Sequence, residues 1–329
     1  MLKFDEGLYQ RQYTVVKNKK GLCFNVTLWR ILMKLYLNKF FVSLIVAGSM
    51  ILSSSSTSHA IINGSPANAK DYKSFVQVEG CGGVLIAKDI VLTAAHCACR
   101  FAKSGSVIVG SDKLNVVTRG AQKRDIVPGW YAIHPESPYN HHGSFDYPNC
   151  LNQSHGAGDM DFMLIKIQPV TKRTIIRKIP TLYKSTKVST RKKLKAVGFG
   201  TKVHNPFAGP DEDVFRETLY HAEFKAHSDK TCEDIWESEP FIDYNKKSTF
   251  CVSNKKNYCT SVSYGDSGGP IYDRKRKKVV GIASYVELEC DSNTRPIVSV
   301  FSRVSYVSDW IENTVCELSD YAPATCPKD

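Results

Sequence analysis

The sequence lacks an apolar run long enough to cross a bilayer as an ordinary helix. The longest run covers residues 40–52 of the 329-residue chain, whereas a membrane-spanning helix needs about 20 apolar residues. A run of this length suits the core of a signal peptide, and Lys34 and Lys39 precede it while small residues lead to Ala60. We therefore expect cleavage, secretion to an extracellular or periplasmic space, and no stable membrane association afterwards. A retained signal-anchor is the alternative.

Met33 opens a compact signal of ordinary shape. We therefore assign residues 1–60 to an N-terminal extension and a signal peptide, with the signal at 33–60. We expect translation to start at Met33, and an unusual translated extension over 1–32 is the alternative.

Acidic residues are fewer than basic ones, 32 against 44, which gives a net charge of +12. Residues 1–60 contribute eight basic and two acidic residues, so the remainder holds 36 and 30 and carries +6. No stripe of interleaved basic and aromatic residues accompanies this mild excess. Nucleic acid is therefore not an expected partner.

Helical periodicity and internal repeats are also scarce beyond residue 60. The apolar runs are short, rich in β-branched residues and separated by Gly, Pro, Asn and Ser, which predicts many strands. Only Val304, Val307, Ile311 and Val315 follow a helical stripe, which predicts one terminal helix docked on the core. The pattern indicates an all-β barrel or sandwich.

A polar loop from about residue 135 to 158 holds the one concentration of histidines, and these share no recognised ligand spacing. We expect a solvated loop there and neither metal nor cofactor. The residues considered as ligands are His134, His141, His142, His155 and Asp146.

The most informative motif is the hexapeptide GDSGGP at 265–270, which places Ser267 on a turn between glycines. Upstream lie His96, within TAAHC at 93–97, and Asp161, directly before an apolar run. A serine hydroxyl needs a base to become a nucleophile, and an imidazole titrates near neutral pH. The chain order His, Asp, Ser is one of three known for this chemistry.

With these three motifs the chain resembles the chymotrypsin/trypsin family of secreted serine proteases, from Ile61 to about Ile311. The resemblance implies two antiparallel six-stranded β-barrels with a C-terminal helix and a cleft between the barrels. We assign about 61–175 to the first barrel, about 176–316 to the second barrel and helix, and 317–329 to a disulfide-stapled tail.

The resemblance also implies the catalytic roles. Ser267 attacks the peptide carbonyl, His96 transfers the proton and Asp161 orients His96. Asp159 is the competing carboxylate, but only Asp161 directly precedes the strand pattern. The backbone N–H groups of Gly265 and Ser267 are the expected oxyanion hole.

The segment that begins at Ile61 resembles the family's mature N-terminus, whose amino group pairs with the aspartate before the nucleophile, here Asp266. Family members usually release this terminus by a cut after Lys or Arg, but Ala60 stands here. We therefore expect signal cleavage itself to expose Ile61.

The predicted substrate pocket contains no acidic residue at its floor. The floor position is Ser261, or Asn257 if Cys259 is taken as a displaced family cysteine. Ser284, Tyr285 and Val286 resemble the substrate-binding strand, and Ser299, or Ile297 in another register, would line the opposite wall. A valine at 286 narrows such a pocket as in elastases, which predicts cleavage after small or medium apolar residues.

Eleven cysteines suit an oxidising compartment, and loss of Cys23 with the leader leaves an even number. The resemblance implies three bridges, and proximity of loops in the family suggests a fourth, while the tail suggests a fifth. These pairs are Cys81 with Cys97, Cys232 with Cys251, Cys259 with Cys290, Cys99 with Cys150, and Cys316 with Cys326.

We expect a monomer whose partners are protein or peptide substrates and protein protease inhibitors. A catalytically silent homologue that acts as a binding module is the alternative, because this scaffold also persists without activity.

Overall fold

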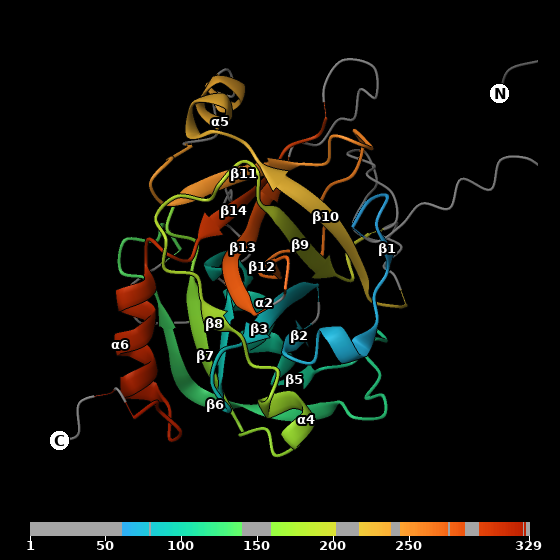
Figure 1. Cartoon of the computed structure of the whole chain (residues 1–329). Coiled ribbons are helices and arrows are strands. Elements are labelled where there is room, and N and C mark those ends of the chain that lie inside the picture. Colours follow the sequence, from blue (N-terminus) through green and yellow to red (C-terminus); the bar gives the residue numbers. More distant parts are fainter. Residues whose placement is uncertain are drawn as a thin grey trace, which may run out of the picture. The chain divides into compact units, whose positions relative to one another are not determined.

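The computed structural model describes residues 61–78, 80–139, 159–201, 217–237, 244–275, 277–286, 296–324 and 326, with backbone alone for Cys99 and Ala102 (Figure 1). The predicted extension and signal peptide lie outside these ranges. No helix among the described residues is both long and apolar enough to span a membrane.

Six antiparallel strands close the first barrel in the order β2-β3-β4-β7-β6-β5. Closure leaves no strand edge unpaired. The strands are β2 (Phe75–Val78), β3 (Cys81–Leu85), β4 (Ile90–Thr93), β5 (Ser106–Val109), β6 (Gln122–Ile133) and β7 (Met163–Ile167).

The second barrel follows the order β10-β11-β14-β13-β12-β9 and is closed by pairing of β9 with β10. Together the two barrels confirm the predicted all-β architecture. The strands are β9 (Lys193–Gly198), β10 (Tyr220–Ala226), β11 (Thr249–Ser253), β12 (Pro270–Asp273), β13 (Lys278–Val286) and β14 (Ser299–Arg303).

Short helical segments connect the strands, and the C-terminal helix α6 (Ser308–Leu318) is the longest of those described. Its stripe residues Ile311 and Val315 are buried in the same core as the first barrel, which confirms the predicted docking. The other segments are η1 (Ala69–Asp71), η2 (Ala95–Cys97), α2 (Ala98–Ser104), α4 (Arg173–Ile176) and α5 (Asp229–Trp236).

Each end of the described two-barrel region packs on the barrel that is more distant in sequence. β1 (Ser65–Pro66) lies in the segment predicted for the first barrel, yet it pairs with β10 of the second. At the other end, α6 follows the second barrel and packs against β6 and β7 of the first. Asp89 of the first barrel is fully buried and accepts the Ser319 hydroxyl at 2.5 Å and the Asp320 N–H at 2.9 Å, just beyond α6.

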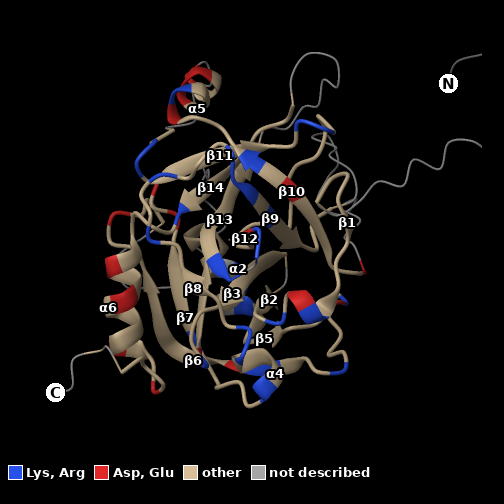
Figure 2. Cartoon of the chain, in the orientation of Figure 1, with Lys and Arg blue, Asp and Glu red and all other residues tan. Residues whose placement is uncertain are grey.

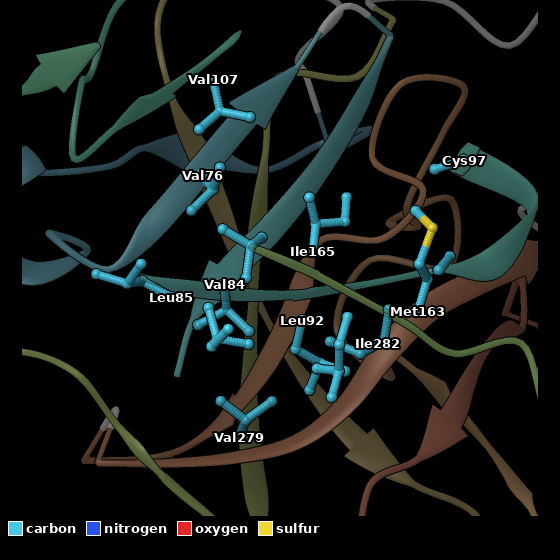
Figure 3. Packing of buried hydrophobic residues seen from close by; sticks show 14 of the residues in the cluster. Val76, Val84, Leu85, Leu92, Cys97, Val107, Met163, Ile165, Val279 and Ile282 are labelled. Carbon is cyan, nitrogen blue, oxygen red and sulfur yellow. The ribbon is translucent and has the colours of Figure 1, made fainter. Parts of the chain in front are cut away.

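A continuous apolar core joins the two barrels. Figure 3 shows Val84, Leu92 and Met163 of the first barrel close to Val279 and Ile282 of β13. All five side chains are essentially inaccessible to solvent. Side chains from both barrels therefore pack in one cluster at the level of the candidate site, and the cluster holds the two halves of that site in a fixed relation.

Candidate functional site

His96 and Asp161 are brought together by the pairing of β4 with β7. Thr93 at the end of β4 lies opposite Met163 at the start of β7, so the residues that follow one strand and precede the other are neighbours. His96 Nδ1 lies 2.7 Å from Asp161 Oδ2, and the backbone N–H of His96 donates to Oδ1 at 2.9 Å. Both carboxylate oxygens of Asp161 therefore form hydrogen bonds with His96.

The second barrel adds a third donor to this carboxylate. The Ser284 hydroxyl donates to Asp161 Oδ2 at 2.7 Å. Ser284 lies where the pairing of β13 with β14 shifts register between Ala283 and Tyr285, and such a bulge redirects a side chain. The Ser284 hydroxyl therefore points toward the Asp161 carboxylate.

Burial disfavours the charged forms of Asp161 and His96, but the attraction between the two groups favours these forms more strongly. Burial alone would raise the pKa of Asp161, yet the His96 ring, its backbone N–H and Ser284 bring that pKa below its usual value. Burial alone would lower the pKa of His96, yet the Asp161 carboxylate raises it. The pair is built to stabilise an imidazolium.

Asp159, the competing carboxylate, binds residues of the second barrel and not His96. It accepts the Asn245 amide at 2.6 Å and the Ser248 hydroxyl, both from the segment before β11. Asp161, and not Asp159, therefore contacts His96, and Asp159 ties the loop before β7 to the second barrel.

Ser267 sits on a turn that packs against the strand leading to His96. The N–H of Gly82 donates to the Ser267 carbonyl at 2.7 Å. Gly268 has φ +74°, and an added Cβ there would lie 2.2 Å from Thr93 Oγ1. Glycine is therefore required at 268 both for its conformation and for this close approach. The Ser267 hydroxyl is partly exposed and makes no hydrogen bond to any residue in the described ranges.

Two backbone donors of the same turn are left available. Gly268 N–H donates to Ala283 O at 2.8 Å and Gly269 N–H donates to Asp266 O at 2.9 Å. The N–H groups of Gly265 and Ser267 have no acceptor among the residues that the structure describes. Gly265 has φ +88°, which favours glycine at this position.

Asp266 is buried beside Ile61. Its carboxylate accepts N–H bonds from Gly200 at 2.8 Å and Ser263 at 2.9 Å, and the backbone N–H of Ile61 bonds to it as well. Burial raises the pKa of Asp266 to about 7, although the three backbone donors oppose the shift. Before cleavage, Asp266 therefore has hydrogen-bond donors but no positive charge beside it among the described residues.

Ile61 itself is fully buried with φ +40°, a conformation that a β-branched residue rarely adopts. The dihedral φ involves the preceding carbonyl carbon. A cut between residues 60 and 61 would remove this constraint while leaving the nitrogen beside Asp266.

Ser261 occupies a buried position in the predicted pocket. Its hydroxyl has no hydrogen-bond partner among the described groups. Ser299, also fully buried, accepts the N–H of Val262 at 3.2 Å. Asn257 is exposed and accepts the N–H of Cys259, so burial favours the register with Ser261 at the floor.

The remaining pocket residues lie on or beside the second barrel. Tyr285 packs edge-on against Trp236, with ring centroids 5.3 Å apart. Val286 is half-buried against the second hydrophobic core. Ile297 is buried and donates its N–H to Tyr258 O at 2.7 Å.

Three predicted disulfides are present, Cys81–Cys97, Cys232–Cys251 and Cys316–Cys326. Cys259 is disulfide-bonded, and its predicted partner Cys290 lies outside the described residues. The predicted pairing of Cys99 with Cys150 also lies outside what the structure describes.

The histidines of the predicted polar loop are described only in part. His134 packs edge-on against Trp310 at 4.9 Å, whereas His141, His142, His155 and Asp146 lie outside the described residues. His96 lies near Cys81 and Cys97, but these sulfurs are bonded to each other and are not free thiolates for a metal.

Tyr139 is a site residue that sequence reasoning missed. Its ring centroid lies 6.0 Å from that of His96, and it packs at the edge of the first core. A single tyrosine in a polar loop carries no motif. Only the structure shows that Tyr139 lies beside His96.

Comparisons with known proteins agree with this geometry. The family model described as Trypsin matches residues 61–311. The chain is 27% identical to a chymase of Rattus norvegicus over 279 residues, which cover 82% of this chain and 96% of the relative. It is 30% identical to mast cell protease 2 of Meriones unguiculatus over 253 residues, 76% and 83% of the two chains, and 28% identical to scolexin B of Heliothis virescens over 241 residues, 70% and 74%. The chain therefore belongs to the trypsin family of serine proteases.

Proposed function

We propose that this protease is an endopeptidase that works through an acyl-enzyme formed on Ser267. The observation that carries the proposal is the buried Asp161 carboxylate, which lies 2.7 Å from the His96 ring, while Gly268 of the Ser267 turn approaches Thr93, three residues before His96. No feature of the described residues favours the catalytically silent alternative.

In the proposed reaction, the Ser267 oxygen attacks the peptide carbonyl while His96 Nε2 takes the hydroxyl proton. The Nδ1–H of His96 keeps its hydrogen bond to the Asp161 carboxylate, which stabilises the imidazolium. The carbonyl oxygen gains negative charge and accepts the unused N–H groups of Gly265 and Ser267, each worth about 3 kcal/mol of barrier. His96 then returns the proton to the leaving amine, and water releases the acyl group by the same steps.

We infer that the amino group of Ile61 completes the site once it is free. An ammonium group at this nitrogen would pair with the Asp266 carboxylate, and a buried charge of either sign costs several kcal/mol without its partner. The Ile61 N–H already bonds to Asp266. Secretion with cleavage after Ala60 would therefore yield a competent enzyme directly.

The pocket supports a preference for small or medium apolar residues. Ser261 at the floor is neutral, so it offers no counter-charge to Arg or Lys. Val286 is the last residue of β13 and packs, partly buried, against the second core. A branched side chain at this position would narrow the pocket. Protein or peptide substrates, with protein inhibitors that imitate them, are the partners that this site fits, and we propose that the enzyme acts as a monomer.

The nucleophile is tested with a fluorophosphonate probe on the exported protein. We expect the wild type to be labelled, and Ser267→Ala to lose labelling and about 10⁶-fold in kcat. Ser185→Ala, an exposed serine, is the matched control and should label normally. A correctly processed wild type that resists the probe would favour the silent homologue.

The role of Asp161 is tested by the pH dependence of kcat/KM. Catalysis needs neutral His96, and Asp161 raises the pKa of His96, so activity falls as the pH drops through that raised value. Asp161→Asn should move this acid limb to lower pH and reduce kcat by about 10⁴-fold, the loss typical of the family. Asp159→Asn is the control and should leave the limb in place. If the acid limb of kcat/KM stayed at the same pH in Asp161→Asn, the proposed pairing of Asp161 with His96 would be contradicted.

Processing is tested by N-terminal sequencing of the secreted protein. We expect the mature chain to begin with Ile61, because only then can its amino group pair with Asp266. Another first residue in fully active enzyme would exclude this mode of activation.

Specificity is tested with a peptide library. Val286→Gly should widen the pocket and improve kcat/KM for large aromatic residues at the cleaved position by about tenfold or more. Val116→Gly, the same change at an exposed site, should leave the profile unaltered. Preference of the wild type for Arg or Lys would overturn the assignment of the pocket.

A further inference from the structure

A stretch without a single acidic residue connects the two barrels. Residues 162–201 contain eleven Lys and Arg and no Asp or Glu. β12 and β13 pair as a hairpin, and a second basic tract, DRKRKK, runs in the sequence from Asp273 at the end of β12 to Lys278 at the start of β13. The catalytic mechanism uses neither tract.

The fold brings these tracts side by side. β8 (Thr181–Leu182) runs parallel to β13, with Thr181 opposite Lys278, and the Thr181 N–H donates to Lys277 O at 2.9 Å. On the other side of the hairpin, Asp273 pairs with Leu194 near the start of β9. The hairpin tip therefore lies between the connection and β9.

We define the basic face by six exposed residues from these three segments. Figure 2 marks Lys and Arg in blue on α4, which directly precedes two of these residues, and near β8. The residues are Arg177, Lys178, Arg191, Arg274, Lys275 and Lys277.

The positive charge of the basic face is not neutralised within the described residues. None of its six members takes part in an ion pair there, whereas neighbours outside it do, such as Lys184 with Glu312 at 2.6 Å and Lys193 with Glu223 at 2.7 Å. Asp273, at the start of the hairpin tract, accepts the backbone N–H groups of Lys277 and Lys278. Its carboxylate therefore stabilises the turn between β12 and β13. Unpaired like charges repel one another and attract polyanions.

We propose that the basic face binds an anionic polysaccharide. No exposed large hydrophobic residue of the described chain lies in either basic tract, so the tracts offer no exposed ring for stacking bases and no anchor for a bilayer interface. The ring of Tyr183, close by, is covered by Lys192 Nζ at 4.1 Å from its centroid. The exposed large hydrophobic residues of the described chain are Val116, Val117, Trp130, Tyr258, Tyr264, Tyr306 and Tyr321, all outside both basic tracts.

Binding at the basic face would leave the catalytic site open. β13 begins at Lys278 beside this face and reaches Ser284, which contacts Asp161, six residues later. At about 3.3 Å per residue, the two ends are about 20 Å apart along the strand. A polysaccharide chain could therefore hold the enzyme in place while the enzyme cleaves other molecules.

The experiment measures binding of the secreted protein to immobilised heparin at physiological salt. Replacement of three charges in the hairpin, Arg274→Gln, Lys275→Gln and Lys277→Gln together, should raise Kd at least about tenfold and flatten its dependence on salt. The matched control removes the same charges from exposed sites in the first barrel, Arg119→Gln, Lys113→Gln and Lys123→Gln, and should keep nearly all the affinity.

Hydrolysis of a short peptide substrate should be the same in both variants, which shows that each is folded. Equal loss of heparin binding in the two triple variants would overturn the proposal, because net charge alone would then account for binding. Tighter binding to duplex DNA or to phosphatidylserine vesicles than to heparin would overturn it in favour of those ligands.

Discussion

The buried carboxylate of Asp161 is the interaction on which the site depends. It accepts the ring and the backbone N–H of His96 and the hydroxyl of Ser284. Two of these donors come from the first barrel and one from the second, so the carboxylate is both the electrostatic partner of the base and a link between the barrels. A buried charge is tolerated when its hydrogen-bonding capacity is filled in this way.

A second buried carboxylate, Asp266, shows the opposite behaviour in the same molecule. Asp266 has three backbone donors and, among the described residues, no cationic side chain that lowers its pKa, which burial raises to about 7, whereas Asp161 has an imidazole beside it and a lowered pKa. Both groups are fully buried, so the difference lies in the neighbouring charge. Asp266 is thus the group whose ionisation would respond most strongly to a new positive charge at Ile61.

Much of this could be predicted from the sequence because the informative residues are local. Short β-branched runs indicate strands, and the GDSGGP hexapeptide fixes a turn through its glycines. The choice of Asp161 over Asp159 followed from which one borders a strand, since the first residues before a strand are held in register by it.

Other features depend on tertiary contacts that no local pattern carries. The position of Tyr139 beside His96, the β13 bulge that turns Ser284 toward Asp161, and the pairing of β1 with the second barrel all arise between distant segments. The pocket register was ambiguous for the same reason, because Cys259 is displaced and only the burial of Ser261 and exposure of Asn257 distinguish the alternatives.

The crossed ends of the domain bear on how its halves stay associated. β1 lies on the second barrel and α6 on the first, and the three bridges seen among the described cysteines each lie within one barrel or within the tail. Each barrel is therefore covered by a terminal segment that belongs in sequence to the other side. If another protease cleaved the connection between α4 and β9, the two fragments would stay associated, because each keeps a terminal segment packed on the other.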